Sequence, residues 1–192
     1  MPTETLHDWN LEPTKAIALQ KRLATHIECE DRLGAVRHIA GVDIGFEQGG
    51  EVTRAAVVVL TWPDDLLAGC DGDSLAGLEV LEQVVHREPT RMPYSPGLLS
   101  FREIPAALAA FDKLTVRPEL VMVDGQGIAH PRRLGVASHL GLWLDLPTIG
   151  VARSRLGGVH DAVRGARGEW TPLTRRGETI GAVLRTRVGV KP

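Results

Sequence analysis

Two long apolar segments on either side of a short glycine turn constrain the fold more than any other feature of the sequence. The first is VRHIAGVDIGFE, residues 36–47, and the second is EVTRAAVVVLTW, residues 51–62. The intervening QGG, residues 48–50, is a turn signal, so the pair predicts an antiparallel hairpin. Because two strands with an apolar face need a third for stability, we interpret the ambiguous segment GLEVLEQVVHRE, residues 77–88, as that strand.

Apolar spacing elsewhere distinguishes helices from short buried strands. Leu19, Leu23 and Ile27 recur every four residues, which indicates a helix from Thr14 to about Asp31. The segments LVMVD and PTIGVA are short continuous apolar runs, which are typical of buried parallel strands. We further expect a loop over 63–76, helices over 105–114 and 132–146, strands over 120–124 and 147–152, and an edge strand over 178–186.

The order of these elements predicts the fold class. Three antiparallel strands come first, and a helix–strand–helix–strand succession follows. Because consecutive elements pack as neighbours, this order predicts an α/β fold with one mixed sheet and helices on both faces. The order resembles that of the ribonuclease H-like fold.

Composition limits the class and setting of the protein. A chain of 192 residues with 43% hydrophobic residues is large enough for one domain with a core. The two cysteines, Cys29 and Cys70, lack metal-site spacing and suit a reducing compartment, so we expect a cytoplasmic protein. No stretch reaches the ~18 apolar residues that a membrane-spanning helix needs, and we expect no membrane partner.

Charge is distributed unevenly along the chain. Residues 1–92 hold 8 Lys/Arg against 16 Asp/Glu, whereas residues 151–192 hold 9 against 3. The basic third is almost entirely arginine, which is suited to binding a phosphate backbone. A solvated surface explains the same charges equally well.

Two aspartates stand at positions where a carboxylate is unusual. Asp43 lies within the apolar strand IAGVDIGF, and Asp124 ends the strand LVMVD before a glycine-rich turn. If these strands are neighbours, the carboxylates lie side by side and cannot both stay ionised without a cation, for which Mg²⁺ or Mn²⁺ is suited. The alternatives are an Asp43 paired with an arginine and an Asp124 that only forms the turn.

Glu103 is the third candidate carboxylate. Ser100 and Glu103 match the S-x-x-E capping box, which is the structural alternative. That alternative places Pro105 at the fifth helical position, where its ring and missing N–H disrupt the first turn. We therefore expect the helix to begin near Ile104 or Pro105, with Glu103 at the loop–helix junction and free to bind metal.

The segment PYSPGLLSFREIP, residues 93–105, presents the only tyrosine of the chain between two prolines. Pro93 and Pro96 restrict the backbone, so Tyr94 is held in place without an ordering cost on binding. The segment predicts a rigid aromatic projection, and a stiff surface turn with an incidental tyrosine is the alternative.

Four segments of the chain resemble the signature motifs of the endonuclease V family: GVDIGF, PYSPGLLSFRE, VDGQGIAHPRRLGVASHLG and PTIGVARSRL. The resemblance implies a ribonuclease H-like fold and a Mg²⁺-dependent DNA repair endonuclease, with Mn²⁺ as a substitute. It also implies recognition of deoxyinosine and cleavage of the second phosphodiester bond 3′ to it, with a 3′-hydroxyl product. The partner is then DNA containing deoxyinosine, and the protein is expected to be monomeric. An inosine-binding protein with weak or no cleavage, and an inosine-specific RNA endonuclease, are the alternatives.

The same resemblance assigns roles to individual residues. It implies that Asp43, Glu103 and Asp124 bind metal and that His130 lies beside the metal and takes part in catalysis. It makes Tyr94, on the loop with Pro96, a wedge in the DNA. The resemblance also implies that Gly97, Leu99, Gly125 and Gly127 form the walls of the base pocket. Because arginine suits phosphate, we interpret four further residues as candidate phosphate contacts: Arg132, Arg133, Arg153 and Arg155.

The sequence departs from the family pattern in two places. Arg153 stands where the family usually has lysine, which keeps the charge and changes its shape. The family normally continues beyond the final RVGVKP with a further strand, a Ser-Pro-Gly-His segment and a helix. We therefore expect residues 1–192 to form one endonuclease V-like domain that lacks this C-terminal strand and helix.

Overall fold

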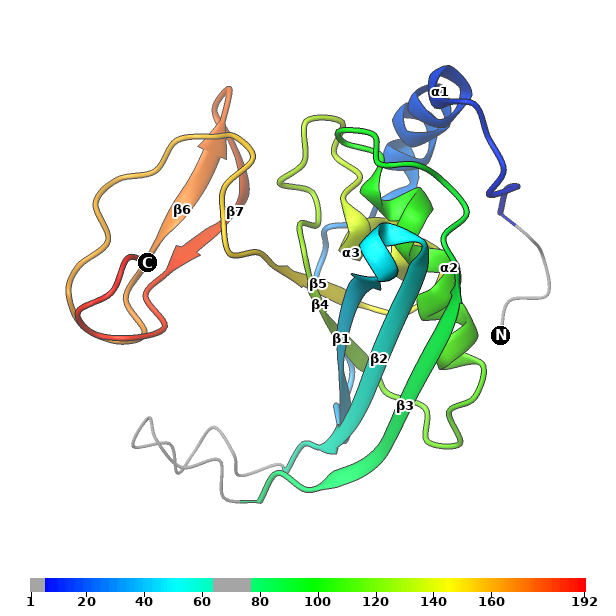
Figure 1. Cartoon of the computed structure of the whole chain (residues 1–192). Coiled ribbons are helices and arrows are strands. Elements are labelled where there is room, and N and C mark those ends of the chain that lie inside the picture. Colours follow the sequence, from blue (N-terminus) through cyan, green and yellow to red (C-terminus); the bar gives the residue numbers. More distant parts are fainter. Residues whose placement is uncertain (1–5, 64–76) are drawn as a thin grey trace.

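A computed structural model describes residues 6–63 and 77–192, and its centre is a five-stranded mixed sheet (Figure 1). Its strand order is β3-β2-β1-β4-β5. The first three strands are antiparallel, and β4 and β5 continue the sheet in parallel with β1. The strand bounds are β1 His38–Glu47, β2 Val52–Thr61, β3 Val80–Pro89, β4 Leu120–Asp124 and β5 Thr148–Val151. All five strands were predicted, and the ribonuclease H-like arrangement is confirmed.

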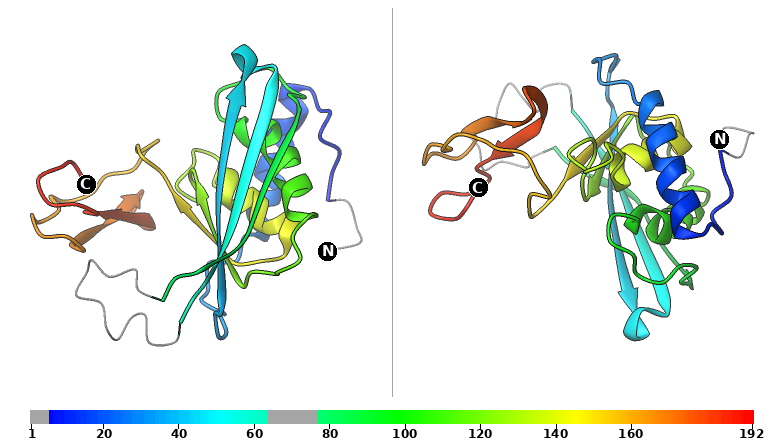
Figure 2. Two further views of the ribbon diagram at one scale, coloured as in Figure 1. Left: turned by 60° about the horizontal axis from the view of Figure 1, so that its bottom comes forward. Right: turned by 90° about the horizontal axis from the view of Figure 1, so that it is seen from above.

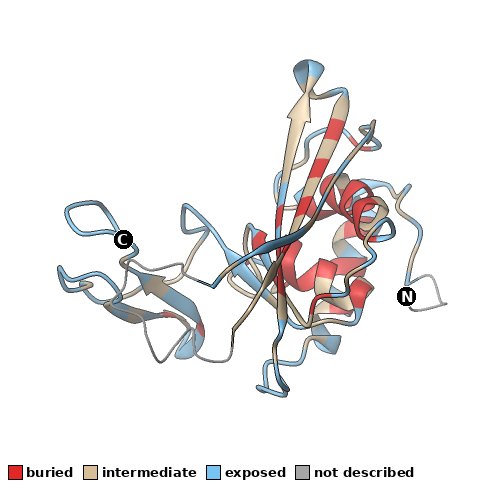
Figure 3. Cartoon of the chain, turned by 90° about the horizontal axis from the view of Figure 1, so that it is seen from below, coloured by how far each residue is buried: buried red, intermediate tan, exposed pale blue. Residues whose placement is uncertain are grey.

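The hairpin of β1 and β2 forms as its sequence pattern predicted. The register runs from His38 opposite Thr61 to Glu47 opposite Val52, and the 3-10 turn Gln48–Gly50 (η2) closes it. Gly50 has a φ of 103°, a conformation that a residue with a side chain rarely adopts. Alternate residues of β2 are buried, as Figure 3 shows, so one face of the sheet forms the core.

The helices lie in two layers on that buried face of the sheet. Helices α2 (Leu99–Phe111) and α3 (Val136–Leu144) pack directly on the strands. Helix α1 (Pro13–Leu23) packs on the beginning of α2, on the side away from the sheet (Figure 2). None of the described helices is long and apolar enough to cross a membrane.

The expectation of helices on both faces of the sheet is wrong for the described residues, whose helices all lie on one face. Helix α2 connects β3 to β4 and α3 connects β4 to β5, and both connections cross the sheet in the same direction. Because such crossovers are right-handed, both helices are placed on the same face. The opposite, open face carries exposed apolar side chains, namely those of Val85, Met122, Ile149 and Val151.

Other element boundaries differ from the predictions. Helix α1 ends at Leu23 and is followed by the 3-10 turn Ala24–His26 (η1), and α3 begins only at Val136. The predicted edge strand forms as β7 (Glu178–Leu184), but it pairs with β6 (Trp170–Arg175) in a separate two-stranded sheet. Strand β6 was not predicted, because its sequence WTPLTR contains a proline and little alternation. Of the loop predicted over 63–76, only Pro63 lies within the described residues.

The start of α2 shows the largest difference between a predicted and an observed element boundary. The helix begins at Leu99, so Pro105 lies inside it and leaves the Phe101 carbonyl without its usual helical donor. Full burial of Phe101 and Ile104 stabilises the added turn. The capping box is excluded as well: Ser100 lies inside the helix, and its hydroxyl donates to Nδ1 of His139 at 3.0 Å.

Ser100 belongs to a buried polar network that ties α2 to α3 and to the residues before α1. The Nε2 atom of His139 lies 2.8 Å from Nε2 of His7, which also accepts a hydrogen bond from the Trp143 indole. The His7 Nδ1–H donates to the carbonyl of Asp8, so His139 is the donor to His7. Burial lowers the pKa of His139 to about 3, so the ring is neutral at neutral pH.

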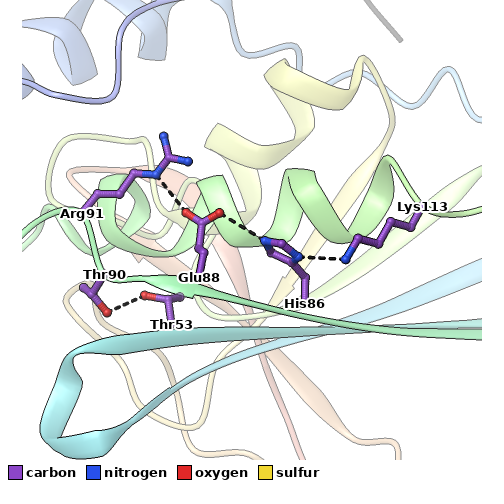
Figure 4. A network of polar contacts seen from close by, with 6 residues as sticks. All are labelled: Thr53, His86, Glu88, Thr90, Arg91 and Lys113. Atoms are coloured by element: carbon purple, nitrogen blue, oxygen red, sulfur yellow. Dashed lines mark hydrogen bonds and ion pairs between the residues drawn. The ribbon is translucent and has the colours of Figure 1, made fainter.

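Polar contacts also anchor β3 and the residues that lead from it to the proline segment, as Figure 4 shows. The Glu88 carboxylate forms an ion pair with Arg91 at 2.9 Å, and it lies 3.3 Å from Nε2 of His86. The His86 ring is 2.9 Å from Lys113, just beyond the end of α2. These contacts attach the chain on the N-terminal side of the proline segment to the sheet and to α2.

Candidate active site

Asp43 and Asp124 lie on adjacent parallel strands where β4 ends. The register pairs Val42 with Val123, so the next residue of each strand is an aspartate. Val42 and Val123 are buried against the helices, and successive side chains alternate, so both aspartates face the open side of the sheet. Both line one shallow pocket of about 490 Å³, whose other walls are Gly41, Val42, Ala56, Val58, Met122, Val123, Val151 and Arg153.

Glu103 approaches these aspartates from the helical layer. It lies within α2, not at the predicted loop–helix junction, and is only 6% exposed. The pKa of its carboxyl is raised to about 8, chiefly by burial and also by the charges of Asp124 and Asp43, against the opposing charge of Arg102. The carboxyl makes no hydrogen bond or ion pair with another described residue. The three carboxylates therefore share one electrostatic environment, in which simultaneous ionisation is unfavourable.

The donor set of this site suits a hard divalent cation, although the described residues contain no preformed group of three or more His, Cys, Asp or Glu side chains at metal-binding distance. All three donors are carboxylates, the ligands that Mg²⁺ and Mn²⁺ prefer. A buried, unpartnered carboxyl with a raised pKa is the kind of group that a cation would ionise. Arg153 now pairs with Asp124 at 3.1 Å, and its side chain is 88% exposed and can move aside.

His130 lies with the proline segment and does not line the pocket of Asp43 and Asp124. It is buried, its Nδ1 accepts the backbone N–H of Arg132 at 3.2 Å, and its ring also meets the backbone of Gly97. Burial and the charge of Arg132 lower its pKa to about 4, so the ring is neutral at neutral pH. In this arrangement His130 supports the loop.

The proline segment has an exposed tip on a firm base. Tyr94 is 68% exposed, and Pro93 and Pro96 beside it are also exposed. The N–H of Leu98 closes a turn by donating to the Ser95 carbonyl at 3.0 Å, and the Leu98 side chain is buried in the core. The tyrosine ring is therefore presented to solvent by a loop whose base is packed.

Two of the residues predicted to form the walls of the base pocket, Gly97 and Leu99, belong to this segment. Gly97 has a φ of +75°, and its carbonyl accepts hydrogen bonds from Arg132 at 2.6 Å and from Gln20 at 2.9 Å. Leu99 follows at the start of α2 and is 38% exposed. Both lie within five residues of Tyr94, so a base that reached one of them would remain close to the ring.

The glycine turn after Asp124 packs closely against the residues at the start of α3. Gly125 has a φ of +141° and donates its N–H to the Val151 carbonyl at 2.9 Å, whereas the Gly127 carbonyl accepts from Gly135. A Cβ on Gly135 would overlap the backbone of Gln126. Sequence reasoning included Gly125 and Gly127 but missed Gly135, although the spacing of glycines in DGQG and RRLG was a signal for it.

The four candidate phosphate-binding arginines divide into two pairs. Arg132 and Arg133 bind other protein groups: Arg132 bonds to Gln20 and Gly97, and Arg133 pairs with Glu178 of β7. Arg153 and Arg155 are exposed beyond β5. Sequence reasoning also missed Gln20, because no local pattern indicates a hydrogen bond to a residue 77 positions away.

A ribonuclease H-like sheet with two neighbouring aspartates where β4 ends, and a buried glutamate beside them, is characteristic of metal-dependent nucleases, and comparison with known proteins identifies the family. The endonuclease V family matches residues 21–192. An endonuclease V of Trichormus variabilis is 50% identical over 187 residues, which cover 97% of this chain and 79% of the relative. The chain belongs to the endonuclease V family, and the protein is an endonuclease that hydrolyses phosphodiester bonds.

Solved structures agree with this assignment. The endonuclease V of Streptomyces avermitilis has a TM-score of 0.82 at 36% identity, over 96% of this chain and 76% of that one. The endonuclease V of Ciona intestinalis, solved with a 23mer DNA containing an inosine followed by a ribo-adenosine, has a TM-score of 0.60 at 27% identity. That match covers 76% of this chain and 58% of the Ciona chain.

Proposed function

We propose that this protein is a Mg²⁺-dependent DNA repair endonuclease that recognises deoxyinosine and cleaves the second phosphodiester bond 3′ to it, leaving a 3′-hydroxyl. Mn²⁺ substitutes for Mg²⁺. The observation that carries the proposal is the placement of Asp43 beside Asp124, with the buried carboxyl of Glu103 close enough to have its pKa raised by both. The Ciona relative, solved with inosine-containing DNA, supports the choice of substrate.

Asp43, Glu103 and Asp124 would hold the cation. When bound, it would lower the pKa of a water molecule and neutralise charge on the phosphate that is cleaved. Arg153 must leave Asp124 for this to happen, and its exposed guanidinium can then contact a neighbouring phosphate. Glu103 would hold the cation as the ionised carboxylate, since the pKa of a coordinated carboxyl falls.

Tyr94 would act as the wedge. A lesion base cannot be read inside the stack, so it is swung out of the duplex and an aromatic side chain occupies the gap. The exposed ring lies on a loop whose base is packed by Leu98 and held by hydrogen bonds at Gly97. Little conformational freedom is lost when this loop meets DNA.

Backbone amides of the two glycine segments would read the extruded base. Hypoxanthine presents a carbonyl at C6 and an N–H at N1, where adenine presents an amino group and an acceptor. The N–H of Gly125 is bonded to Val151, whereas those of Gly97 and Gly127 donate to no other described residue and can meet the carbonyl. Adenine would leave such donors unpaired, which costs ~1–3 kcal/mol each.

An inosine-specific RNA endonuclease is the second candidate. It is favoured by the ribo-adenosine that follows inosine in the DNA bound by the Ciona relative. In RNA, the 2′-hydroxyl supplies an additional donor and acceptor for recognition. An inosine-binding protein that cuts weakly is the third, since no preformed metal cluster is found among the described residues and Arg153 pairs with Asp124.

One assay separates the three candidates. End-labelled DNA and RNA oligonucleotides, each with a single inosine or a matched adenosine, are incubated with Mg²⁺ or with EDTA. The proposal expects Mg²⁺-dependent nicking of inosine DNA at the second bond, with the adenosine strand intact. Nicking confined to RNA supports the second candidate, and retarded mobility without a nick supports the third.

A further inference from the structure

Gln20 is a fully buried polar residue on the apolar side of α1. It is 1% exposed and lies among the buried residues Ala16, Leu19 and Leu23 of the same helix. Burying an amide without partners is unfavourable, so such a group is found only where its hydrogen bonds are made. Gln20 therefore has a role that an apolar residue cannot fill.

The Gln20 carboxamide makes three hydrogen bonds to two distant segments. Its Nε2 donates to the Gly97 carbonyl at 2.9 Å and to the Leu134 carbonyl at 3.3 Å. Its Oε1 accepts from Nε of Arg132 at 2.5 Å. Gln20 thus joins α1 to the proline segment and to the residues that precede α3.

The Gly97 carbonyl is the centre of this network. It accepts from Nη2 of Arg132 at 2.6 Å as well as from Gln20, and the backbone of Gly97 also meets the ring of His130. The Arg132 guanidinium lies where a Cβ of Gly97 would project, and the φ of +75° also disfavours a side chain at this position. The orientation of the peptide after Gly97 is therefore set by side chains from two other parts of the chain.

From these contacts we infer that Gln20 is a positioning residue for lesion recognition. By orienting Arg132 and binding Gly97, it holds the base of the loop that presents Tyr94, three residues before Gly97. Tyr94 then enters the duplex without first being ordered. The inference rests on the proposed function only for the role of Tyr94 in DNA; the hydrogen-bond network is independent of it.

The test compares Gln20→Met with Glu82→Ala. Methionine has a similar length and no amide, so it removes all three hydrogen bonds and keeps an apolar fit. Glu82 on β3 accepts from the backbone of Thr115 and Val116 beyond the far end of α2, so its alanine variant loses bonds remote from the loop. Thermal unfolding of both variants shows whether they are destabilised to a comparable extent.

The chain has a single tyrosine, so 3-fluorotyrosine labels Tyr94 alone and its ¹⁹F resonance reports on the loop without DNA. We expect one narrow resonance in the wild type and in Glu82→Ala, and a broadened or split resonance in Gln20→Met. On DNA, we expect Gln20→Met to lower kcat/KM for inosine substrate roughly 10-fold, because only a fraction of the molecules then hold the loop in the binding conformation. Affinity for undamaged duplex stays within about 2-fold, because phosphate contacts provide it.

An unchanged ¹⁹F resonance in Gln20→Met overturns the inference, and so do equal losses of affinity for inosine and undamaged DNA. If Gln20→Met does not fold, Arg132→Met tests the same link from its other end, since methionine has no donor for Gln20 or Gly97. A wild-type protein that does not act on inosine DNA refutes the proposed function instead. The ¹⁹F comparison then still decides whether Gln20 holds the loop.

Discussion

Replacing Glu103 with glutamine should make the metal-free protein more stable at alkaline pH. The pKa of the Glu103 carboxyl is about 8 in the folded protein, against an ordinary value of 4.5, because the group is buried beside Asp124 and Asp43. Between these two values the folded protein holds a proton that the unfolded chain releases. The free energy of unfolding therefore falls as pH rises, by about 1.4 kcal/mol per pH unit and by roughly 5 kcal/mol over the whole interval. Glutamine cannot ionise, so the variant loses this dependence.

Urea unfolding between pH 5 and 8.5 in EDTA measures the effect. His130 and His139 have pKa values lowered to about 4 and about 3, so they contribute the opposite slope, but only below pH 6.5. The interval from pH 7 to 8 therefore isolates Glu103. There, wild type should lose about 1 kcal/mol while Glu103→Gln stays level. Near pH 5 the two proteins should differ little.

Repeating the series with Mg²⁺ tests whether a cation removes the repulsion. Wild type should regain stability at pH 8, because the cation stabilises the ionised carboxyl, and Glu103→Gln should gain much less. A wild-type curve that stays level from pH 7 to 8 in EDTA would show that the three carboxyls do not share one environment. A variant that follows the wild-type curve would show that another group causes the slope.

Three further substitutions test the candidate site. Asp43→Asn should lower nicking of inosine DNA roughly 1000-fold while binding in a mobility-shift assay is kept, because a ligand to the cation is lost; nicking at the wild-type rate refutes the metal assignment. Tyr94→Ala should reduce discrimination between inosine and undamaged duplex roughly 10-fold, through loss of an aromatic ring against the bases. Equal losses on both duplexes would make Tyr94 a general contact. Gly135→Ala should reduce the free energy of unfolding by about 1–3 kcal/mol, since its Cβ overlaps the backbone of Gln126; an unchanged urea midpoint would contradict this packing.

Local sequence pattern was sufficient for the strands of the main sheet. Apolar segments bounded by turn residues predicted all five, and two aspartates at fixed places in two of them predicted a shared site. Parallel pairing of β1 with β4 then places Asp43 next to Asp124, because the register of the strands leaves no other arrangement. These features depend on contacts between near neighbours or between whole strands, and such contacts appear as periodicity in the sequence.

Tertiary contacts decided the remainder. The rule against a proline inside a helix led us to predict that α2 begins near Pro105, whereas it begins at Leu99. The earlier start is stable because burial of Phe101 and Ile104 and the bond from Ser100 to His139 outweigh the hydrogen bond that Pro105 removes. The inward direction of Arg132 and the role of Gln20 depend on partners more than 30 residues away. A hydrogen bond between such distant residues requires particular atoms to meet after folding, and no spacing along the chain encodes that meeting.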